Sequence, residues 1–309
     1  MRDALARAIT EAARQRSDVV LVVADISPAA ALKTFLDENP TRIVDVGVSE
    51  QAMIGMAAGL AMTGLRPFTY TIAPFALYRP LEQIRVDLAY QDLPVVVVGV
   101  GAGLSYSALG ATHHTIEDVA IASAIPNITV VAPCDPAETQ AAVDASFGLT
   151  GPMYLRLGKS GEPDLTVDAP EPFVLGRIRC LAQGSGTAVI GYGPLLDMAF
   201  QAADLASAPR PSIYSAHTIK PLDVERVDRI LRDYDHVIVL EEHVENGGLG
   251  MRVRARAQQV GASDTAITAF HLPDRFLHTY GSKDDLIGPE GISVEELAAA
   301  IRRDVRHGR

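Results

Sequence analysis

The sequence predicts an α/β protein with two domains, a doubly wound, mostly parallel sheet domain followed by a smaller α/β domain. Short runs rich in valine and isoleucine alternate with segments of helical spacing along nearly the whole chain, a pattern typical of parallel sheets covered by helices. Glycine and proline interrupt this alternation repeatedly between residues 158 and 186, which indicates a connection between two units. The length of 309 residues is about twice that of a usual domain, so each unit can bury its own core.

Composition and charge exclude several classes of protein. Hydrophobic residues make up 48% of the chain and charged residues 21%, as in globular proteins. The net charge of -11 argues against nucleic acid or an anionic membrane as a partner, because both would repel the chain. No run reaches the roughly 18 apolar residues of a membrane span, and the charged start Met1–Arg7 does not resemble a signal peptide. Cys134 and Cys180 lack metal-ligand spacing and are expected to be reduced, so we predict a cytoplasmic protein.

The first domain begins with helical spacing of leucine and alanine over residues 2–16. Further helices are predicted around residues 46–61, 80–91 and 116–124. Strands buried on both faces are predicted between them, at residues 19–25, 68–72, 94–100 and 128–132. Ligands of such sheets bind beyond the carboxyl ends of the strands, so the loops that follow these segments hold the candidate site residues.

The alternation resumes after the interrupted segment. Strands are predicted at residues 188–192, 212–215 and 236–240, and helices at residues 195–206 and 222–232. These features divide the chain into a first domain at residues 1–165, a linker at 166–186 and a second domain at 187–309.

Glu50 stands out because it begins an apolar helix of small residues, Gln51–Ala61. Glutamate is almost never fully buried unless another group pairs with it. Two interpretations are open at this point. Glu50 lies at the solvated end of the helix, where the helix dipole favours an acid, or it has a special partner.

Three other features follow predicted strands. Asp25 ends the first strand, where an aspartate is commonly a helix N-cap. Phe75 and Tyr78 lie three residues apart, and such a pair is more often part of a core than a stacking platform. His113 and His114 follow a glycine-containing approach, and adjacent histidines there are poorly suited to a core and well suited to proton transfer.

The remaining candidates have structural interpretations. Thr115 can cap the following helix with Asp118 as its partner. His217 and His243 come after strands of the second domain and are more typical of structural than of catalytic residues. Taken singly, none of these signals identifies a reaction.

The first domain lacks the usual devices for binding phosphate. It has no Walker loop, and the glycines of residues 99–103 have the wrong spacing for a dinucleotide fingerprint. No set of Asp and Asn residues resembles a magnesium site for a diphosphate, and no metal ligand is predicted in this chain. If this fold binds a phosphorylated cofactor, it does not hold the phosphates itself.

The order of these motifs resembles the C-terminal half of transketolase and of its thiamine-diphosphate relatives, deoxyxylulose-phosphate synthase and the beta subunits of 2-oxoacid dehydrogenases. The matching pieces keep the family order over nearly the whole chain. They are Asp45-Val46-Gly47-Val48-Ser49-Glu50-Gln51, Gly110-Ala111-Thr112-His113-His114, Thr218-Ile219-Lys220-Pro221-Leu222-Asp223, and Glu241-Glu242-His243 with Gly247-Gly248-Leu249-Gly250.

The resemblance implies a pyrimidine-binding domain followed by a transketolase C-terminal domain. Full-length transketolases have a further domain that binds the diphosphate and Mg²⁺ through a Gly-Asp-Gly and Asn motif, and this chain does not contain it. The resemblance therefore implies one subunit of a split transketolase, which transfers a two-carbon ketol unit from a ketose or ketose phosphate to an aldehyde. An N-terminal-type subunit would be its partner, in an α2β2 assembly with thiamine diphosphate between the subunits.

The resemblance also implies roles for individual residues. Glu50 would hydrogen-bond the ring nitrogen N1′ of the aminopyrimidine and favour the tautomer that takes the proton from thiazolium C2. Burial among apolar side chains favours the neutral carboxyl group that this contact needs. Phe75 would stack on the pyrimidine, with Ile72 and Tyr78 completing the pocket.

Three more positions take roles from the resemblance. Asp25 would lie near the cofactor at the subunit interface. His113 would assist proton transfer and contact the substrate hydroxyl, and its neighbour His114 would also bind the substrate.

Three positions depart from the transketolases of the pentose phosphate pathway. Leu109 replaces an aspartate that reads the substrate's hydroxyl stereochemistry, Gly101 replaces a histidine, and a serine that contacts phosphate is missing near Ala29. Lys159 stands for the arginine that holds the acceptor phosphate, without the two-pronged grip of a guanidinium. A specialised sugar substrate or a biosynthetic acceptor therefore stays open.

Two other functions remain as alternatives. One is the beta subunit of a 2-oxoacid decarboxylating component. The other is a non-catalytic chain that only binds and regulates a partner, which the presence of Glu50, Phe75 and His113 argues against.

Overall fold

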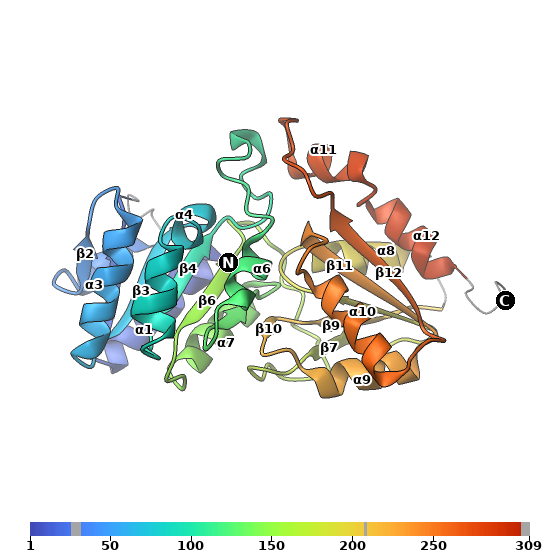
Figure 1. Ribbon diagram of the computed structural model, residues 1–309, viewed down its shortest axis with the longest axis horizontal. Coiled ribbons are helices and arrows are strands. Elements are labelled where there is room, and N and C mark those ends of the chain that lie inside the picture. Colours follow the sequence, from blue (N-terminus) through green and yellow to red (C-terminus); the bar gives the residue numbers. More distant parts are fainter. Residues whose placement is uncertain (26–31, 207–208, 304–309) are drawn as a thin grey trace.

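A computed structural model describes residues 1–25, 32–206 and 209–303 of the chain. Two mostly parallel sheets lie side by side, each covered by helices (Figure 1), and the predicted α/β class with two sheet domains is confirmed. Strands and helices alternate because valine-rich runs are buried on both faces, which only a sheet with helices on either side allows.

The first sheet has the strand order β10-β5-β6-β4-β3-β1-β2, and only β10 runs antiparallel to its neighbour. Its strands are β1 (Val19–Val23), β2 (Ile43–Asp45), β3 (Arg66–Ile72), β4 (Val96–Val100), β5 (Thr129–Val131), β6 (Met153–Leu157) and β10 (Thr218–Lys220). The central strands β1, β3, β4 and β6 are parallel, so their carboxyl ends meet at one edge.

Helices cover both faces of this sheet. They are α1 (Arg2–Gln15), α2 (Lys33–Glu38), α3 (Glu50–Met62), α4 (Ala73–Leu77), α5 (Leu81–Gln83), the π-helix η2 (Ile84–Ala89), the 3-10 helix η3 (Ser107–Leu109), α6 (Asp118–Ala124) and α7 (Pro136–Ser146). Side chains of α1 and α7, including Ile9 and Val143, form one core layer with the sheet. The other face carries α3, η2 and α6, and its core continues into the second sheet.

The second sheet has the strand order β12-β11-β8-β9-β7. Its strands are β7 (Arg179–Ala182), β8 (Thr187–Gly191), β9 (Ser212–Ser215), β11 (His236–Val244) and β12 (Ala266–Leu272), and its helices are α8 (Leu196–Ala206), α9 (Val224–Asp233), α10 (Leu249–Val260), α11 (Lys283–Ile287), the 3-10 helix η4 (Gly288–Glu290) and α12 (Val294–Arg302). Strand β7 lies within the segment 166–186 that the sequence suggests as a linker. It forms a strand because it pairs antiparallel with β9. Four residues are too few to show the alternation of apolar and polar side chains by which a strand is recognised in a sequence.

One strand connects the two halves of the molecule. Strand β10 belongs to the second half by sequence but pairs with β5 of the first sheet, where Thr218 lies opposite Val131. The amide of Ala132 donates to the carbonyl oxygen of His217 at 2.7 Å. Lys220 donates to the carbonyl oxygens of Ser123 and Ile125 at the end of α6. The second half therefore completes the hydrogen bonding of the first sheet's edge.

His217 lies buried at this junction. Its ring stacks on Phe173 with 4.1 Å between the centroids, and its Nδ1 lies 3.0 Å from the hydroxyl of Thr218. Burial, with a smaller contribution from Arg179, lowers the pKa of His217 to about 3. The structural role suggested for this histidine is consistent with its full burial.

We expect His217 to make the fold sensitive to acid. Its pKa is about 3 when folded and about 6.5 in an unfolded chain, so a proton binds the unfolded state first. The free energy of unfolding is undiminished by this group above pH 6.5 and falls by about 1.4 kcal/mol per pH unit between 6.5 and 3. The variant His217→Gln lacks this group, so its free energy of unfolding should rise relative to wild type by that amount for each pH unit below about 6.5. Urea unfolding at several pH values measures the difference.

Exposed His278 provides the control for this measurement. His278→Gln is measured in parallel, and its difference from wild type serves as the baseline for the pH series. A His217→Gln difference whose pH dependence does not exceed that baseline would contradict the lowered pKa of His217.

Candidate active site

Three predicted residues meet at the carboxyl edge of the first sheet. Glu50 begins α3, Phe75 lies in α4 directly after β3, and His113 lies in the loop between β4 and α6. Parallel strands place these three connections at the same edge. The site is therefore assembled from segments that are well separated in the sequence.

Glu50 is buried in the first turn of α3, with only 6% of its surface exposed. Its Oε1 accepts a hydrogen bond from the guanidinium Nη1 of Arg79 at 2.7 Å. The interpretation that Glu50 lies at a solvated helix end is wrong, because its side chain is buried. Glu50 lies at the N-terminus of α3 and has a charged partner, Arg79.

Arg79 links Glu50 to Phe75. The guanidinium carbon of Arg79 lies 3.9 Å from the centroid of the Phe75 ring, a cation–π contact. The rings of His113 and Phe75 also meet in an edge-on arrangement, with 5.3 Å between centroids. Arg79 was not among the residues predicted from the sequence. Arg79 lies four residues after Phe75, and side chains four apart in a helical segment are neighbours. This spacing is the only sequence pattern that points to the contact.

Tyr78 and Ile72 flank Phe75 in the same segment of the chain. The hydroxyl of half-buried Tyr78 donates to Oε2 of Glu117 at 2.8 Å. Burial raises the pKa of Tyr78, and the carboxylates of Asp118 and Glu117 raise it further, so the phenol stays neutral. Ile72 ends β3 beside Val100 of β4 and is half-buried.

Asp25 follows β1 at the same edge of the sheet. Its φ of 46° lies in the left-handed region, and its amide donates to Oδ1 of Asp45 at 3.1 Å. It does not cap the next described helix, because the N-cap of α2 is Leu32. Asp25 is exposed beside the loop that leads into Glu50. Ala29 lies outside the described residues.

His113 is held in a loop that closes on itself. Gly103 and Thr115 exchange two backbone hydrogen bonds of 3.0 and 2.9 Å at the base of this loop. Nδ1 of His113 lies 2.9 Å from the hydroxyl of Thr112. Burial lowers the pKa of His113, and the charges of His114 and Arg79 lower it further. The imidazole is therefore neutral near pH 7 and can accept a proton.

His114 differs from the expectation that neither histidine suits a core. It is buried, and its Nε2 lies 3.2 Å from the carbonyl oxygen of Ser107. His113 contacts the ring of Phe75, whereas His114 contacts the backbone of its own loop. The expectation for His114 was therefore wrong.

Tyr106 contacts both Lys159 and His113. Nζ of Lys159 is 4.9 Å from the centroid of the Tyr106 ring, which lies 6.1 Å from the ring of His113. Gly101 has a φ of 72°, and a Cβ there would collide with the ring of Tyr106. A histidine at this position would therefore require Tyr106 to move. Leu109 is exposed at the other side of the loop.

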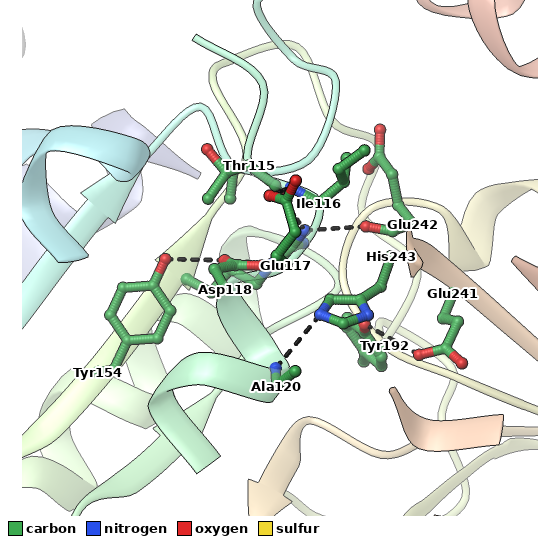
Figure 2. A network of polar contacts seen from close by, with 12 residues as sticks. Thr115, Ile116, Glu117, Asp118, Ala120, Tyr154, Tyr192, Glu241, Glu242 and His243 are labelled. Atoms are coloured by element: carbon green, nitrogen blue, oxygen red, sulfur yellow. Dashed lines mark hydrogen bonds and ion pairs between the residues drawn. The ribbon is translucent and has the colours of Figure 1, made fainter. Parts of the chain in front are cut away.

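A buried polar network lies next to the loop that Gly103 and Thr115 close, called here the histidine loop (Figure 2). Oδ2 of Asp118 accepts from Arg156 at 2.9 Å and from the hydroxyl of Tyr154 at 2.8 Å. Nη2 of Arg156 donates to the carbonyl oxygens of Thr115 and Glu242, both at 3.2 Å. Arg156 thus joins the loop to β11 of the second half.

This network corrects the predicted cap at Thr115. The N-cap of α6 is Glu117, without a side-chain hydrogen bond, and Asp118 is its first residue. The hydroxyl of Thr115 is buried without a partner among the described residues. Asp118 instead pairs with the cation of Arg156, because a fully buried carboxylate requires a charged partner.

Residues of the second half also contact the histidine loop directly. Glu242 accepts from the amide of Leu104 at 2.9 Å and from Lys283 at 3.0 Å. The hydroxyl of Ser107 donates to the carbonyl oxygen of Gly281 at 2.7 Å. Figure 1 shows the segment before α6 and the segment before α11 rising together where the two halves meet. The histidine loop is therefore positioned by both halves.

Glu241 and His243, the neighbours of Glu242 in β11, also make structural contacts. Glu241 fills the N-terminus of α10, where it accepts from the amides of Leu249 at 2.7 Å and Gly250 at 2.8 Å. Burial raises the pKa of Glu241. His243 is fully buried, and its Nε2 accepts from the amide of Ala120 at 3.2 Å (Figure 2). The structural interpretation of His243 agrees with this contact.

Neither a cluster of metal-binding side chains nor a membrane-spanning helix is found in the described part of the chain. No group of three or more His, Cys, Asp and Glu side chains in residues 1–25, 32–206 and 209–303 is arranged to hold a metal ion. Within the same ranges, every helix is too short or too polar to cross a membrane.

Two family models match the chain. Residues 1–162 match the model described as "Transketolase, pyrimidine binding domain", and residues 176–293 match "Transketolase, C-terminal domain".

The chain is similar over most of its length to curated transketolase subunits. It is 32% identical over 291 residues to an apulose-4-phosphate transketolase subunit of Phocaeicola vulgatus, covering 94% of this chain and 92% of that one. It is 34% identical over 253 residues to a 6-deoxy-6-sulfo-D-fructose transketolase subunit of a Clostridium species, covering 81% and 78%. It also matches 1-deoxy-D-xylulose-5-phosphate synthase of Natranaerobius thermophilus, at 30% identity over 96% of this chain but only 47% of the relative.

A solved structure supports the same relationship. The chain superposes on "Split gene transketolase, inactive beta4 tetramer" with a TM-score of 0.88 and 29% identity, covering 100% of this chain and 99% of that one.

Proposed function

This chain belongs to the transketolase family, and from that premise we propose that it is the subunit of a split transketolase that binds the pyrimidine end of thiamine diphosphate. In this role it transfers a two-carbon ketol unit from a ketose to an aldehyde, together with a partner subunit. The observation that carries the proposal is the convergence of buried Glu50, Phe75 and neutral His113 at one sheet edge. The chain carrying this site aligns nearly end to end with a relative named as a transketolase subunit.

The residues present fit an aminopyrimidine. A planar group that bears N–H donors already lies on the face of Phe75 and donates to Glu50, namely the guanidinium of Arg79. An aminopyrimidine is also planar, and it presents ring and amino nitrogens at its edge. The pocket thus offers an aromatic face and a carboxyl oxygen in the arrangement that such a ring requires.

Each residue of the site has a proposed task. Thiamine diphosphate supplies the carbanion chemistry of ketol transfer when it is bound. Glu50 holds a proton at N1′ of the pyrimidine, while Phe75 fixes the plane of the ring. Ile72 and Tyr78 form the pocket walls, and Asp25 contributes at its exposed rim. His113, kept neutral by its surroundings, accepts the proton of a substrate hydroxyl.

The proposed substrates are sugars with an anionic end. The two kinds of split relative are named for a sugar phosphate and for a sulfo sugar, and both names describe anions. Lys159 is an exposed cation against the ring of Tyr106, which in turn contacts His113, and this position suits it to contact such a group. His114, being buried, supports the loop that carries His113. Leu109 and Gly101 replace polar family residues, which favours a sugar other than the common pentose phosphates.

The partner subunit is proposed to hold the diphosphate and Mg²⁺, in an α2β2 assembly. Support comes from an exposed apolar face beside the site. Helix α3 carries apolar residues around its circumference, and Met56 and Met62 are 46% and 58% exposed. Next to it, a groove of about 350 Å³ is lined by Val86, Ala89 and 84%-exposed Tyr90. A helix that is apolar all round is normally buried in an assembly.

Calorimetry of cofactor binding tests this proposal. We expect thiamine diphosphate with Mg²⁺ to bind a mixture of this chain and an N-terminal-type subunit, and not this chain alone, because the site is shared between the chains. Tight, Mg²⁺-dependent binding to this chain alone would mean that it holds the diphosphate unaided, and the split-subunit proposal would be wrong.

A second candidate function comes from the similarity to 1-deoxy-D-xylulose-5-phosphate synthase and from the 2-oxoacid dehydrogenase alternative. Assaying pyruvate and branched 2-oxoacids beside ketose phosphates separates the candidates. Decarboxylation releases carbon dioxide, whereas ketol transfer does not.

A further inference from the structure

We propose that Arg79 is an internal competitor for the pyrimidine pocket, which the cofactor has to displace before Glu50 can act. This inference rests on the proposed function, because it concerns the same pocket. It assigns to Arg79 the control of how readily the pocket accepts its ligand.

Arg79 makes both of the contacts proposed for the pyrimidine ring. Its guanidinium carbon lies 3.9 Å from the centroid of Phe75, and its Nη1 donates to Oε1 of Glu50 at 2.7 Å. At a separation of 3.9 Å the guanidinium is in van der Waals contact with the ring face, so no second planar group fits between them. The pyrimidine and Arg79 therefore cannot occupy this face of Phe75 together.

The charge of the Arg79 contact also opposes the proposed task of Glu50. An ion pair with a guanidinium requires an ionised carboxylate. Holding a proton at N1′ requires the protonated carboxyl group. Displacement of Arg79 therefore has to precede, or accompany, the protonation of Glu50.

Arg79 is able to leave the pocket. Its side chain is 47% exposed, and its guanidinium is held there by Glu50 and Phe75. The Gln51 side chain donates only to the backbone oxygen of Arg79, at 3.4 Å. A change of the Arg79 rotamer therefore opens the pocket without moving α4 or the backbone that follows it.

The variant Arg79→Ala tests the competition directly. Binding to a pocket that is open for a fraction of the time weakens in proportion to that fraction. If Arg79 blocks the pocket for about nine tenths of the time, the pocket is open for about a tenth of it. Removing Arg79 then lowers the Kd of the cofactor about tenfold. The measurement is the Kd of thiamine diphosphate with Mg²⁺ for the assembled complex, determined by calorimetry rather than by activity.

Arg254→Met is the matched control. Arg254 lies outside the site and forms an exposed ion pair with Glu245, with 2.9 Å between Nη1 and Oε1. The Kd of this variant should equal that of wild type. One contrary result is a wild-type complex that binds the cofactor while the Kd of Arg79→Ala is equal to or larger than that of wild type. That result would overturn the role of Arg79 and leave the proposed function standing. Failure of the wild-type complex to bind the cofactor would instead overturn the proposed function.

Discussion

Replacing Glu50 by glutamine should lower ketol transfer by the assembled complex about a thousandfold. The amide keeps the size and the hydrogen bonding of the carboxyl group but cannot pass a proton to the pyrimidine nitrogen, and proton transfer of this kind is worth about 10²–10⁴-fold in rate. Cofactor binding and assembly should persist, because Phe75 and the apolar face of α3 are unchanged. The measurement is turnover with saturating ketose donor and aldehyde acceptor.

Glu82→Gln is the matched control for this experiment. Glu82 is an exposed glutamate in α5, on the segment that follows Arg79, and its replacement should leave turnover unaltered. Full activity of Glu50→Gln in a complex that binds the cofactor normally would show that Glu50 takes no part in proton transfer.

Replacing Asp118 by alanine should lower the free energy of unfolding by about 3–5 kcal/mol, the usual cost of removing one partner of a buried ion pair. Asp118 is fully buried, and Arg156 is 3% exposed, so the substitution leaves an uncompensated guanidinium between the two halves of the molecule. It also removes the acceptor of the Tyr154 hydroxyl. Urea unfolding at pH 7 measures the loss.

The double variant Asp118→Ala/Arg156→Met separates charge from packing. It should be more stable than Asp118→Ala alone, because no buried charge is left without a partner. A single variant that loses less than about 1 kcal/mol, the value of an exposed pair, would contradict the burial of this ion pair. The His217 and Arg79 variants act at other sites and serve as independent tests.

Several parts of the site follow from local pattern. Val19–Val23 and Val96–Val100 form fully buried strands without a single polar side chain, so the edge at which their loops meet was predictable. The position of Glu50 at the start of an apolar helix was also visible, because its α3 begins where the small residues begin.

Contacts between distant segments were not predictable in the same way. Thr115 and Asp118 have the spacing of a capping pair, but Asp118 binds Arg156, 38 residues further along the chain. His113 and His114 look alike in the sequence, yet only His113 faces Phe75. Which of two adjacent side chains enters a core depends on the direction of the backbone in the loop, and hydrophobic periodicity does not report that direction.

The sequence by itself determined the fold class, the alternation of strands and helices, the family motifs and the candidate residues of the site, because each depends on local composition or on short motifs. The tertiary structure alone decided that β10 completes the first sheet and that Arg156 joins the two halves next to the histidine loop. It also decided that Arg79 lies on Phe75 and against Glu50. These contacts arise from the relative placement of segments, and burial makes them strong because a charge removed from water must find its partner in the fold.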